Sequence, residues 1–295
     1  ADAENSGIEL TTNALTTANG SIVRNYATLT SETTSISGSY ENAEGATADF
    51  GALTVAENGL LGNGGTVNAD SLKQTGGQIQ NSGEMTIAGS AASSIAGSIT
   101  NTDTLTFEAG AAVSVVDGAK VTNTGKMTFE TDVNLTGGSI VQNSDTAMEF
   151  TNLTITGGLL DVELEKVVNG SGNLLVNAGA DATAIENDGT INFGSINVEQ
   201  GQITGNGTLG FETSTITVGA NGSVDQTNVI GNTVNNAGSL TADNLMTVAG
   251  AENTGEMSLS GTLDGDLVNN DQLTIEGGEE FILAGGTLTN NGTLT

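Results

Sequence analysis

A short pattern that recurs along the chain constrains the fold more than any other feature of the sequence. One copy runs from Gly76 to Ile87 and reads G-G-Q-I-Q-N-S-G-E-M-T-I. Further copies lie at 99–107, 121–129, 185–193, 251–259, 267–275 and 288–295. A fixed short period indicates a repeat protein, in which each unit buries its apolar face only by stacking on its neighbours.

Apolar and polar residues alternate within each copy. Ile79, Met85 and Ile87 fall on one side together with Asn81 and Gly83, and the residues between them are polar. Alternation with a period of two is typical of a strand, whereas a helical period would mix the two sets. We therefore predict an all-β fold, a right-handed parallel β-helix (β-solenoid) of about 15 coils with roughly 20 residues each.

The asparagine of the pattern defines a column that should stack at one corner of successive coils. Asparagine and glycine tolerate left-handed backbone, and asparagine bonds nearby backbone groups, so N-x-G is typical of a turn. We expect the amides to form a hydrogen-bonded ladder along the solenoid. The predicted ladder contains Asn25, Asn63, Asn81, Asn101, Asn123, Asn143, Asn187, Asn236, Asn253, Asn269 and Asn290. The same column is expected to include Asn5 and Asn42, with glycine in it at Gly170 and Gly205.

The charge of the chain bears on its partners. The formal net charge is −30, from 35 acidic and 5 basic residues. Nucleic acids and anionic membranes both require a basic surface, so we expect neither as a partner. The sequence lacks an apolar run long enough for a transmembrane helix, so we expect no membrane insertion of this segment.

Residue types also bear on catalysis and cofactors. The chain contains no Cys and no His, the usual zinc ligands and the usual catalytic base. Asn101-Thr102-Asp103 resembles a motif of polygalacturonases, but Asp103 occupies the glycine position of the repeat. Paired acids at Asp264 with Asp266 and at Glu279–Glu280 are typical of solvated turns. We predict no enzymatic activity and no cofactor, and leave weakly bound calcium open, because carboxylates and carbonyls are its ligands.

Threonine pairs of the form T-x-T raise the alternative of an ice-binding face. They occur at Thr28–Thr30, Thr104–Thr106 and Thr293–Thr295, but Glu84 and Lys126 interrupt the column. Threonine is also favoured on the solvated side of any strand. We therefore interpret these residues as ordinary outward positions.

No linker interrupts the repeats, which predicts a single β-solenoid domain over residues 1–295. Both ends of the sequence fall within a copy of the pattern. Open solenoid ends expose unpaired strand edges. We therefore expect the chain to be part of a longer array, or to be uncapped at both ends.

The repeats of the form G-x-[IV]-x-N-x-G-x-[LM]-T-[FI] resemble the passenger domains of bacterial autotransporter adhesins. They are also similar to filamentous haemagglutinin-type adhesins. The resemblance covers nearly the whole chain and implies an exported, extracellular protein on the bacterial cell surface. It further implies adhesion, aggregation or biofilm formation, and it implies no role for particular residues.

The sequence thus predicts an extracellular structural or adhesive rod that contacts like molecules or host glycans. An alternative is a filament subunit that polymerises head-to-tail, because a heterologous end contact propagates without closing. The expected end contacts are Ala3, Asn5, Leu288, Asn290 and Leu294. A weaker alternative is a carbohydrate-acting β-helix enzyme, which requires a cleft with two carboxylates at a set separation.

Overall fold

The computed structural model describes residues 2–276 and 280–295, and the chain divides into two compact units, Ala1–Thr151 and Asn152–Thr295. Within the described ranges all regular structure is β-strand, wound as a parallel β-solenoid of about 14 turns. The predicted fold class is therefore confirmed. The right-handed sense of winding and the single-domain organisation stay predictions.

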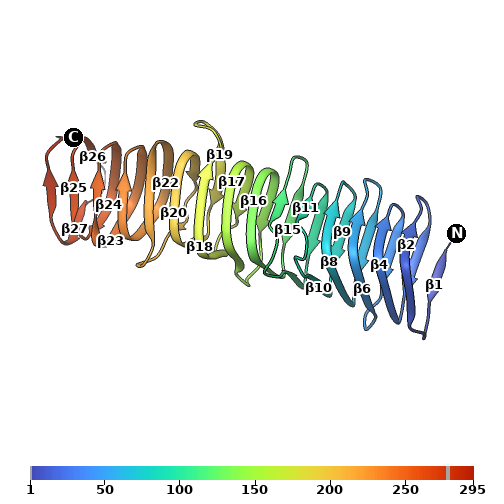
Figure 1. The fold of residues 1–295 in the computed structure, drawn as a ribbon. Coiled ribbons are helices and arrows are strands. Elements are labelled where there is room, and N and C mark those ends of the chain that lie inside the picture. Colours follow the sequence, from blue (N-terminus) through green and yellow to red (C-terminus); the bar gives the residue numbers. More distant parts are fainter. Residues whose placement is uncertain (1, 277–279) are drawn as a thin grey trace. The chain divides into compact units, whose positions relative to one another are not determined.

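In unit 1 each coil carries three strand segments, which form three faces. In one such coil, β3 (Ile22–Asn25) forms the first face, and β4 (Thr28–Ile36) forms the second and third. The alternation of buried and exposed residues in β4 changes phase at Glu32 and Thr33, which are both exposed, and this places a bend there. Figure 1 shows these coils side by side in the blue-to-green part of the chain.

The other strands of unit 1 repeat this arrangement. They are β1 (Ala3–Asn5), β2 (Leu10–Thr17), β5 (Ser39–Asn42), β6 (Thr47–Val55), β7 (Leu60–Asn63), β8 (Thr66–Gln74), β9 (Gln78–Asn81), β10 (Glu84–Ile87), β11 (Ser93–Ile95), β12 (Ser98–Asn101), β13 (Thr104–Phe107), β14 (Val113–Val115), β15 (Lys120–Asn123) and β16 (Lys126–Gln142).

Unit 1 is held together by in-register stacking of equivalent residues. Ile79 of β9 pairs with Ile99 of β12, which pairs with Val121 of β15, and all three are buried. On the next face the rings of Phe107 and Phe129 stack in parallel, with centroids 5.0 Å apart. Burial of such apolar columns contributes roughly 25 cal/mol per Å² of apolar surface. A core can therefore be built without tryptophan and with few other aromatic residues.

Several strands of unit 2 are long, such as β22 with 22 residues, whereas the last ones are short, such as β29 with 2 residues. The strand β17 (Met148–Val162) contains the boundary between the units. The strands that follow are β18 (Val167–Asn177), β19 (Thr183–Asn187), β20 (Thr190–Thr204), β21 (Thr208–Leu209), β22 (Thr215–Asn236), β23 (Ser239–Asn253), β24 (Glu256–Asp264), β25 (Leu267–Asn269), β26 (Gln272–Ile275), β27 (Ile282–Gly285), β28 (Leu288–Asn290) and β29 (Thr293–Leu294). Their pairings are parallel, and the register between β18 and β20 shifts between Gly170 and Asn173.

In the copies that contain Gly83 and Gly125, the glycine of the N-x-G element is required for a different reason than the sequence suggested. Gly83 and Gly125 are absent from the residues with positive φ. A Cβ built on Gly83 would lie 2.2 Å from the carbonyl oxygen of Gly65, and one on Gly125 would lie 2.2 Å from that of Asp103. Close approach of the neighbouring coil, rather than left-handed backbone, therefore selects glycine here.

Candidate functional site

A ladder of side-chain amides runs through the interior of unit 1. Its links are hydrogen bonds from each Nδ2 to the Oδ1 of the next asparagine, with lengths between 2.7 Å (Asn81 to Asn101) and 3.0 Å (Asn42 to Asn63). The members are Asn5, Asn25, Asn42, Asn63, Asn81, Asn101 and Asn123, all buried.

Each ladder amide also closes the corner beside it. The Nδ2 atom of Asn81 donates to the carbonyl oxygen of Thr104 over 2.7 Å, and that of Asn101 donates to Lys126 over 2.9 Å. Buried polar groups cost free energy unless they are hydrogen-bonded. The ladder therefore satisfies the amides and, at the same time, fixes the register of adjacent coils.

The placement of Asn143 in this ladder was wrong. Gln142 stands opposite Asn123 in the parallel register and accepts its Nδ2 hydrogen bond at Oε1 over 2.7 Å. Gln142 is buried, whereas Asn143 is exposed and its backbone N–H bonds the carbonyl of Asn123. The period-two alternation allows only one of two adjacent residues to point inward, and the longer glutamine reaches the ladder.

In unit 2 the predicted single column divides between two corners. Val162, Asn187, Gly205, Gln226 and Ala242 follow one another in one column by the parallel register. The second ladder, Asn236, Asn253, Asn269 and Asn290, continues a different column, which contains Val176, Val198 and Val218.

The second ladder, which lies in unit 2, has the same chemistry as the ladder of unit 1. Asn236 donates to Asn253 over 2.8 Å, Asn253 to Asn269 over 2.7 Å, and Asn269 to Asn290 over 2.7 Å. Asn187 therefore shares no corner with Asn236, although both carry the N-x-G pattern or a close variant of it.

The predicted column includes two glycines, Gly170 and Gly205. Gly205 does follow Asn187, because Glu186 pairs with Thr204 and a Cβ on Gly205 would lie against the Asn187 backbone. The placement of Gly170 was wrong, because Gly170 pairs with Phe193 and Val162 occupies the column instead. A Cβ on Gly170 would lie 1.9 Å from the ring of Phe193, so the aromatic ring selects glycine there.

The residues expected at chain-end contacts differ in burial. Asn5 is buried and its Oδ1 accepts no hydrogen bond within the described part of the chain. Ala3, Asn290 and Leu294 are exposed, and Leu288 is half-buried. End-to-end contact between copies stays a prediction.

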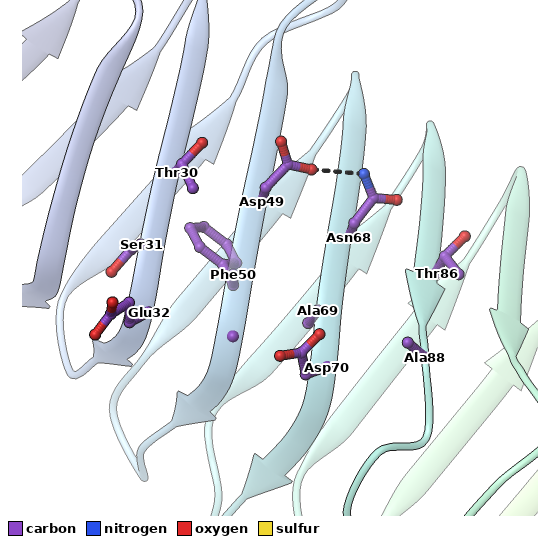
Figure 2. Close-up of a pocket in the computed structure, with 11 residues that line it drawn as sticks. Thr30, Ser31, Glu32, Asp49, Phe50, Asn68, Ala69, Asp70, Thr86 and Ala88 are labelled. Atoms are coloured by element: carbon purple, nitrogen blue, oxygen red, sulfur yellow. Dashed lines mark hydrogen bonds between the residues drawn. The ribbon is translucent and has the colours of Figure 1, made fainter.

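The outer surface of unit 1 has a hollow over β4, β6, β8 and β10, of about 360 Å³ (Figure 2). Its polar residues include Thr30, Asp49, Asn68 and Thr86, which follow one another in register along one row. Asn68 Nδ2 donates to Asp49 Oδ1 over 2.7 Å, the contact drawn in Figure 2.

Small residues form the hollow between two carboxylates. The neighbouring row contains Glu32, Gly51, Asp70 and Ala88 in successive coils, so each acid alternates with a residue that has little or no side chain. A Cβ on Gly51 would lie 2.2 Å from the carbonyl oxygen of Glu32, which explains the glycine. The result is a shallow depression with a partly apolar floor, hydrogen-bond donors and acceptors in one row, and carboxylates in the other. This hollow has no signal in the sequence, because its shape depends on the register of residues that lie far apart in the chain.

A second acidic surface lies in unit 2. Burial raises the pKa of Asp161, and the nearby carboxylates of Glu163, Glu186 and Asp188 raise it further. Asp161 stands opposite Glu186 in the parallel register. Asp188 Oδ1 accepts a hydrogen bond from the backbone N–H of Asn206 over 2.9 Å.

The carboxylates considered for catalysis or for calcium serve local structure. Asp103 is exposed, and its Oδ1 accepts a hydrogen bond from the hydroxyl of Thr104 over 3.2 Å. Asp266 Oδ1 accepts from the N–H and the hydroxyl of Thr287, both over 2.8 Å. Glu279, like the glycines at 277 and 278, lies outside the described residues. Over residues 2–276 and 280–295, acidic residues do not gather in a group of three that suits a metal ion.

The described part of the chain has no helix of the length and apolarity that a membrane crossing needs.

No protein-family model matches the chain, and neither the curated proteins nor the solved structures contain a match.

Proposed function

We propose that the chain is a non-catalytic structural and adhesive segment of a bacterial surface protein, displayed outside the cell. The observation that supports this best is how the side chains divide between the inside and the outside of the coils. Inward residues are used in apolar columns and amide ladders, whereas outward residues form polar rows with one residue per coil, such as Thr30, Asp49 and Asn68. Such a surface presents one hydrogen-bonding side chain per coil, at the strand spacing of about 4.8 Å.

The hollow over β4, β6, β8 and β10 is the place in unit 1 where we propose that a ligand binds. Asp49 and Asn68 together offer an acceptor and a donor to adjacent hydroxyl groups, and the exposed Ala88 offers apolar surface. Concave sites of this kind orient a ligand through a few polar groups over an apolar floor. The carboxylates Glu32 and Asp70 and the net charge of −30 disfavour an anionic ligand. We therefore propose a neutral sugar of a cell-surface glycan.

Display of the chain on bacteria that lack adhesins tests the adhesive function. The expected result is aggregation of the cells or attachment to glycan-coated surfaces. The variant Asp49→Ala with Asn68→Ala should lose attachment to neutral glycans. The matched control is Thr106→Ala with Thr128→Ala, which changes the same outer row away from the hollow. Displayed cells that neither aggregate nor attach would overturn the adhesive function. If both variants lose attachment equally, the adhesive function stands but the assignment of ligand binding to the hollow is overturned.

A second candidate function is head-to-tail polymerisation. Every link of the two ladders runs from the Nδ2 atom of a lower-numbered residue to the oxygen of a higher-numbered one. Asn5 Oδ1 lacks a donor among the described residues, and Asn290 Nδ2 donates to the carbonyl of Gly292 in its own turn. Asn290 of one copy stacked on Asn5 of another would continue the ladder with the same polarity.

Electron microscopy and sedimentation of the purified chain distinguish the two functions. Long fibres that shorten in an Asn5→Leu variant would support polymerisation. A monomer at all concentrations would overturn it, and would leave the adhesive function to be judged by cell attachment.

A further inference from the structure

Seven Asn-Gly pairs occur in the sequence, at Asn19, Asn58, Asn63, Asn169, Asn206, Asn221 and Asn291. In such a pair the backbone nitrogen of the glycine lies next to the asparagine amide, with no Cβ on the glycine to obstruct attack. The structure places these pairs in very different surroundings. We propose that Asn19 is a site of spontaneous self-modification, at which the side chain deamidates through a succinimide.

Two of the pairs lie in equivalent turns of unit 1. Thr17 pairs with Ile36, and Ile36 with Val55, so the turns Ala18–Ser21 and Ala56–Gly59 follow the same column. Each is a four-residue turn with a hydrogen bond from its fourth N–H to its first carbonyl, 3.0 Å in the first and 2.9 Å in the second. Asn19 and Asn58 are both exposed.

The two Asn-Gly pairs differ by one position within these turns. Gly20 is the third residue of its turn, has φ +77°, and its N–H donates no hydrogen bond within the described part of the chain. Gly59 is the fourth residue of its turn, and its N–H is the donor of the turn hydrogen bond to Ala56. The third N–H of a β-turn has no partner in the turn itself, whereas the fourth carries the defining bond. The nitrogen that must attack is therefore free at Gly20 and occupied at Gly59.

Most other pairs are restrained more strongly. Asn63 is buried in the amide ladder, and the N–H of Gly64 bonds the carbonyl of Asn42 over 2.8 Å. The N–H of Gly207 bonds Asn187 over 2.9 Å. Asn169 and Asn221 lie within β18 and β22. The Asn291 side chain donates to Asn270 over 3.0 Å.

The reaction requires only Asn19, Gly20 and water, and no other group of the protein. The Gly20 nitrogen loses its proton to water and bonds to Cγ of Asn19. The bond between Cγ and Nδ2 breaks, the nitrogen takes up a proton from water, and ammonia leaves. Water then opens the five-membered ring at one of its two carbonyls, which gives aspartate or isoaspartate. Each event adds one negative charge to a chain whose formal charge is already −30.

The fold already accommodates the product in an equivalent turn. Val116–Ala119 follows the same column, because Val55, Gln74, Ile95 and Val115 succeed one another in register. In that turn Asp117 and Gly118 take the places of Asn19 and Gly20, with φ +81° at the glycine and a turn hydrogen bond of 3.0 Å. An aspartate at position 19 would therefore occupy the turn position that Asp117 already occupies in an equivalent turn.

The test is peptide mapping of the purified full chain after prolonged incubation in mildly alkaline buffer. Cleavage at Arg24 and Lys73 separates Asn19 from Asn58 and Asn63. Deamidation at Asn19 should be on the order of tenfold faster than at Asn58, because freeing the Gly59 N–H costs about one hydrogen bond. In denaturant the two rates should become similar.

A variant that moves the pair within the second turn completes the test. Glu57→Asn with Asn58→Gly puts an Asn-Gly pair at the second and third turn positions, and should bring fast deamidation to residue 57. Circular dichroism of the native and substituted chains checks that both fold alike. Equal rates at Asn19 and Asn58 in the folded chain would overturn the proposal. So would a rate difference that persists in denaturant, because sequence rather than the turn would then set it.

Discussion

The side chain of Asn187 donates from Nδ2 to Oε1 of Gln226 over 2.6 Å, across a coil that contributes only Gly205 at this position. Gln226 lies two coils from Asn187 in the register and also donates to the carbonyl of Gly205 over 3.3 Å. A glutamine thus continues an amide ladder past a position that has no side chain. Asn187 Oδ1 accepts no hydrogen bond within the described residues, and the register places Val162, which has no amide, before it.

The first prediction concerns this bridge. Gln226→Ala removes the acceptor of the buried Asn187 amide and leaves a cavity beside Gly205. We expect a loss of roughly 1–3 kcal/mol in the free energy of unfolding, the usual cost of an unsatisfied buried polar group. Urea denaturation measures it. The control is Gln272→Ala, an exposed glutamine in the same unit, which should change stability by less than about 0.5 kcal/mol. Equal effects of the two substitutions would contradict the bridge.

The second prediction concerns Gly170 and Phe193. Gly170→Ala places a Cβ against a ring that is fully buried, and we expect a loss of about 1–3 kcal/mol from overpacking. In a background of Phe193→Leu the same substitution should cost less, because the smaller side chain leaves room. A double-mutant cycle from denaturation curves gives the coupling. Additive effects would mean that the Gly170 backbone, and not the ring, requires glycine.

Much of the fold follows from the sequence because the inward positions repeat with period two. Ile79, Ile99 and Val121 were assignable to one stacked column without a structure, and they pair in register. The same alternation identified the members of the unit 1 ladder from Asn25 to Asn123.

The errors have physical causes. Gln142 and Asn143 are adjacent, and only the exact phase of the strand decides which points inward. The N-x-G motif lies at one corner at Asn187 and at another at Asn236, because the chain between them does not span a whole number of coils. A motif that is equally stable at either corner gives no local sign of such a change of corner. The hollow at Glu32 and Asp70 was missed for a similar reason, because it depends on small residues in the coils between.

The third prediction tests the ladder of unit 1. Asn101→Ala interrupts the chain of amides between Asn81 and Asn123, and we expect a loss of roughly 2 kcal/mol or more, since two ladder bonds are removed. Asn143→Ala is the matched control, because Asn143 was predicted in the ladder but is exposed. It should leave the denaturation midpoint almost unchanged. A larger effect at Asn143 than at Asn101 would contradict the observed register.

The fourth prediction concerns the pH dependence of stability in unit 2. Burial, then the charges of Glu163, Glu186 and Asp188, raise the pKa of Asp161 in the folded chain. Between the unfolded and the raised folded pKa, the folded state binds more protons than the unfolded state, so stability falls as pH rises through this window. At neutral pH the carboxylate of Asp161 therefore opposes folding, and acidification towards its folded pKa relieves the penalty.

Asp161→Asn should consequently raise the denaturation midpoint at neutral pH and flatten its dependence on pH in the mildly acidic range. Thermal unfolding across that range provides the measurement, with Glu212→Gln as a control, because Glu212 is an exposed carboxylate in the turn Phe211–Ser214 of unit 2. Added salt should reduce the difference between native chain and variant, because it screens the three neighbouring charges. An unchanged midpoint at neutral pH, or a midpoint that falls, would show that ionised Asp161 makes a favourable contact that outweighs burial and repulsion.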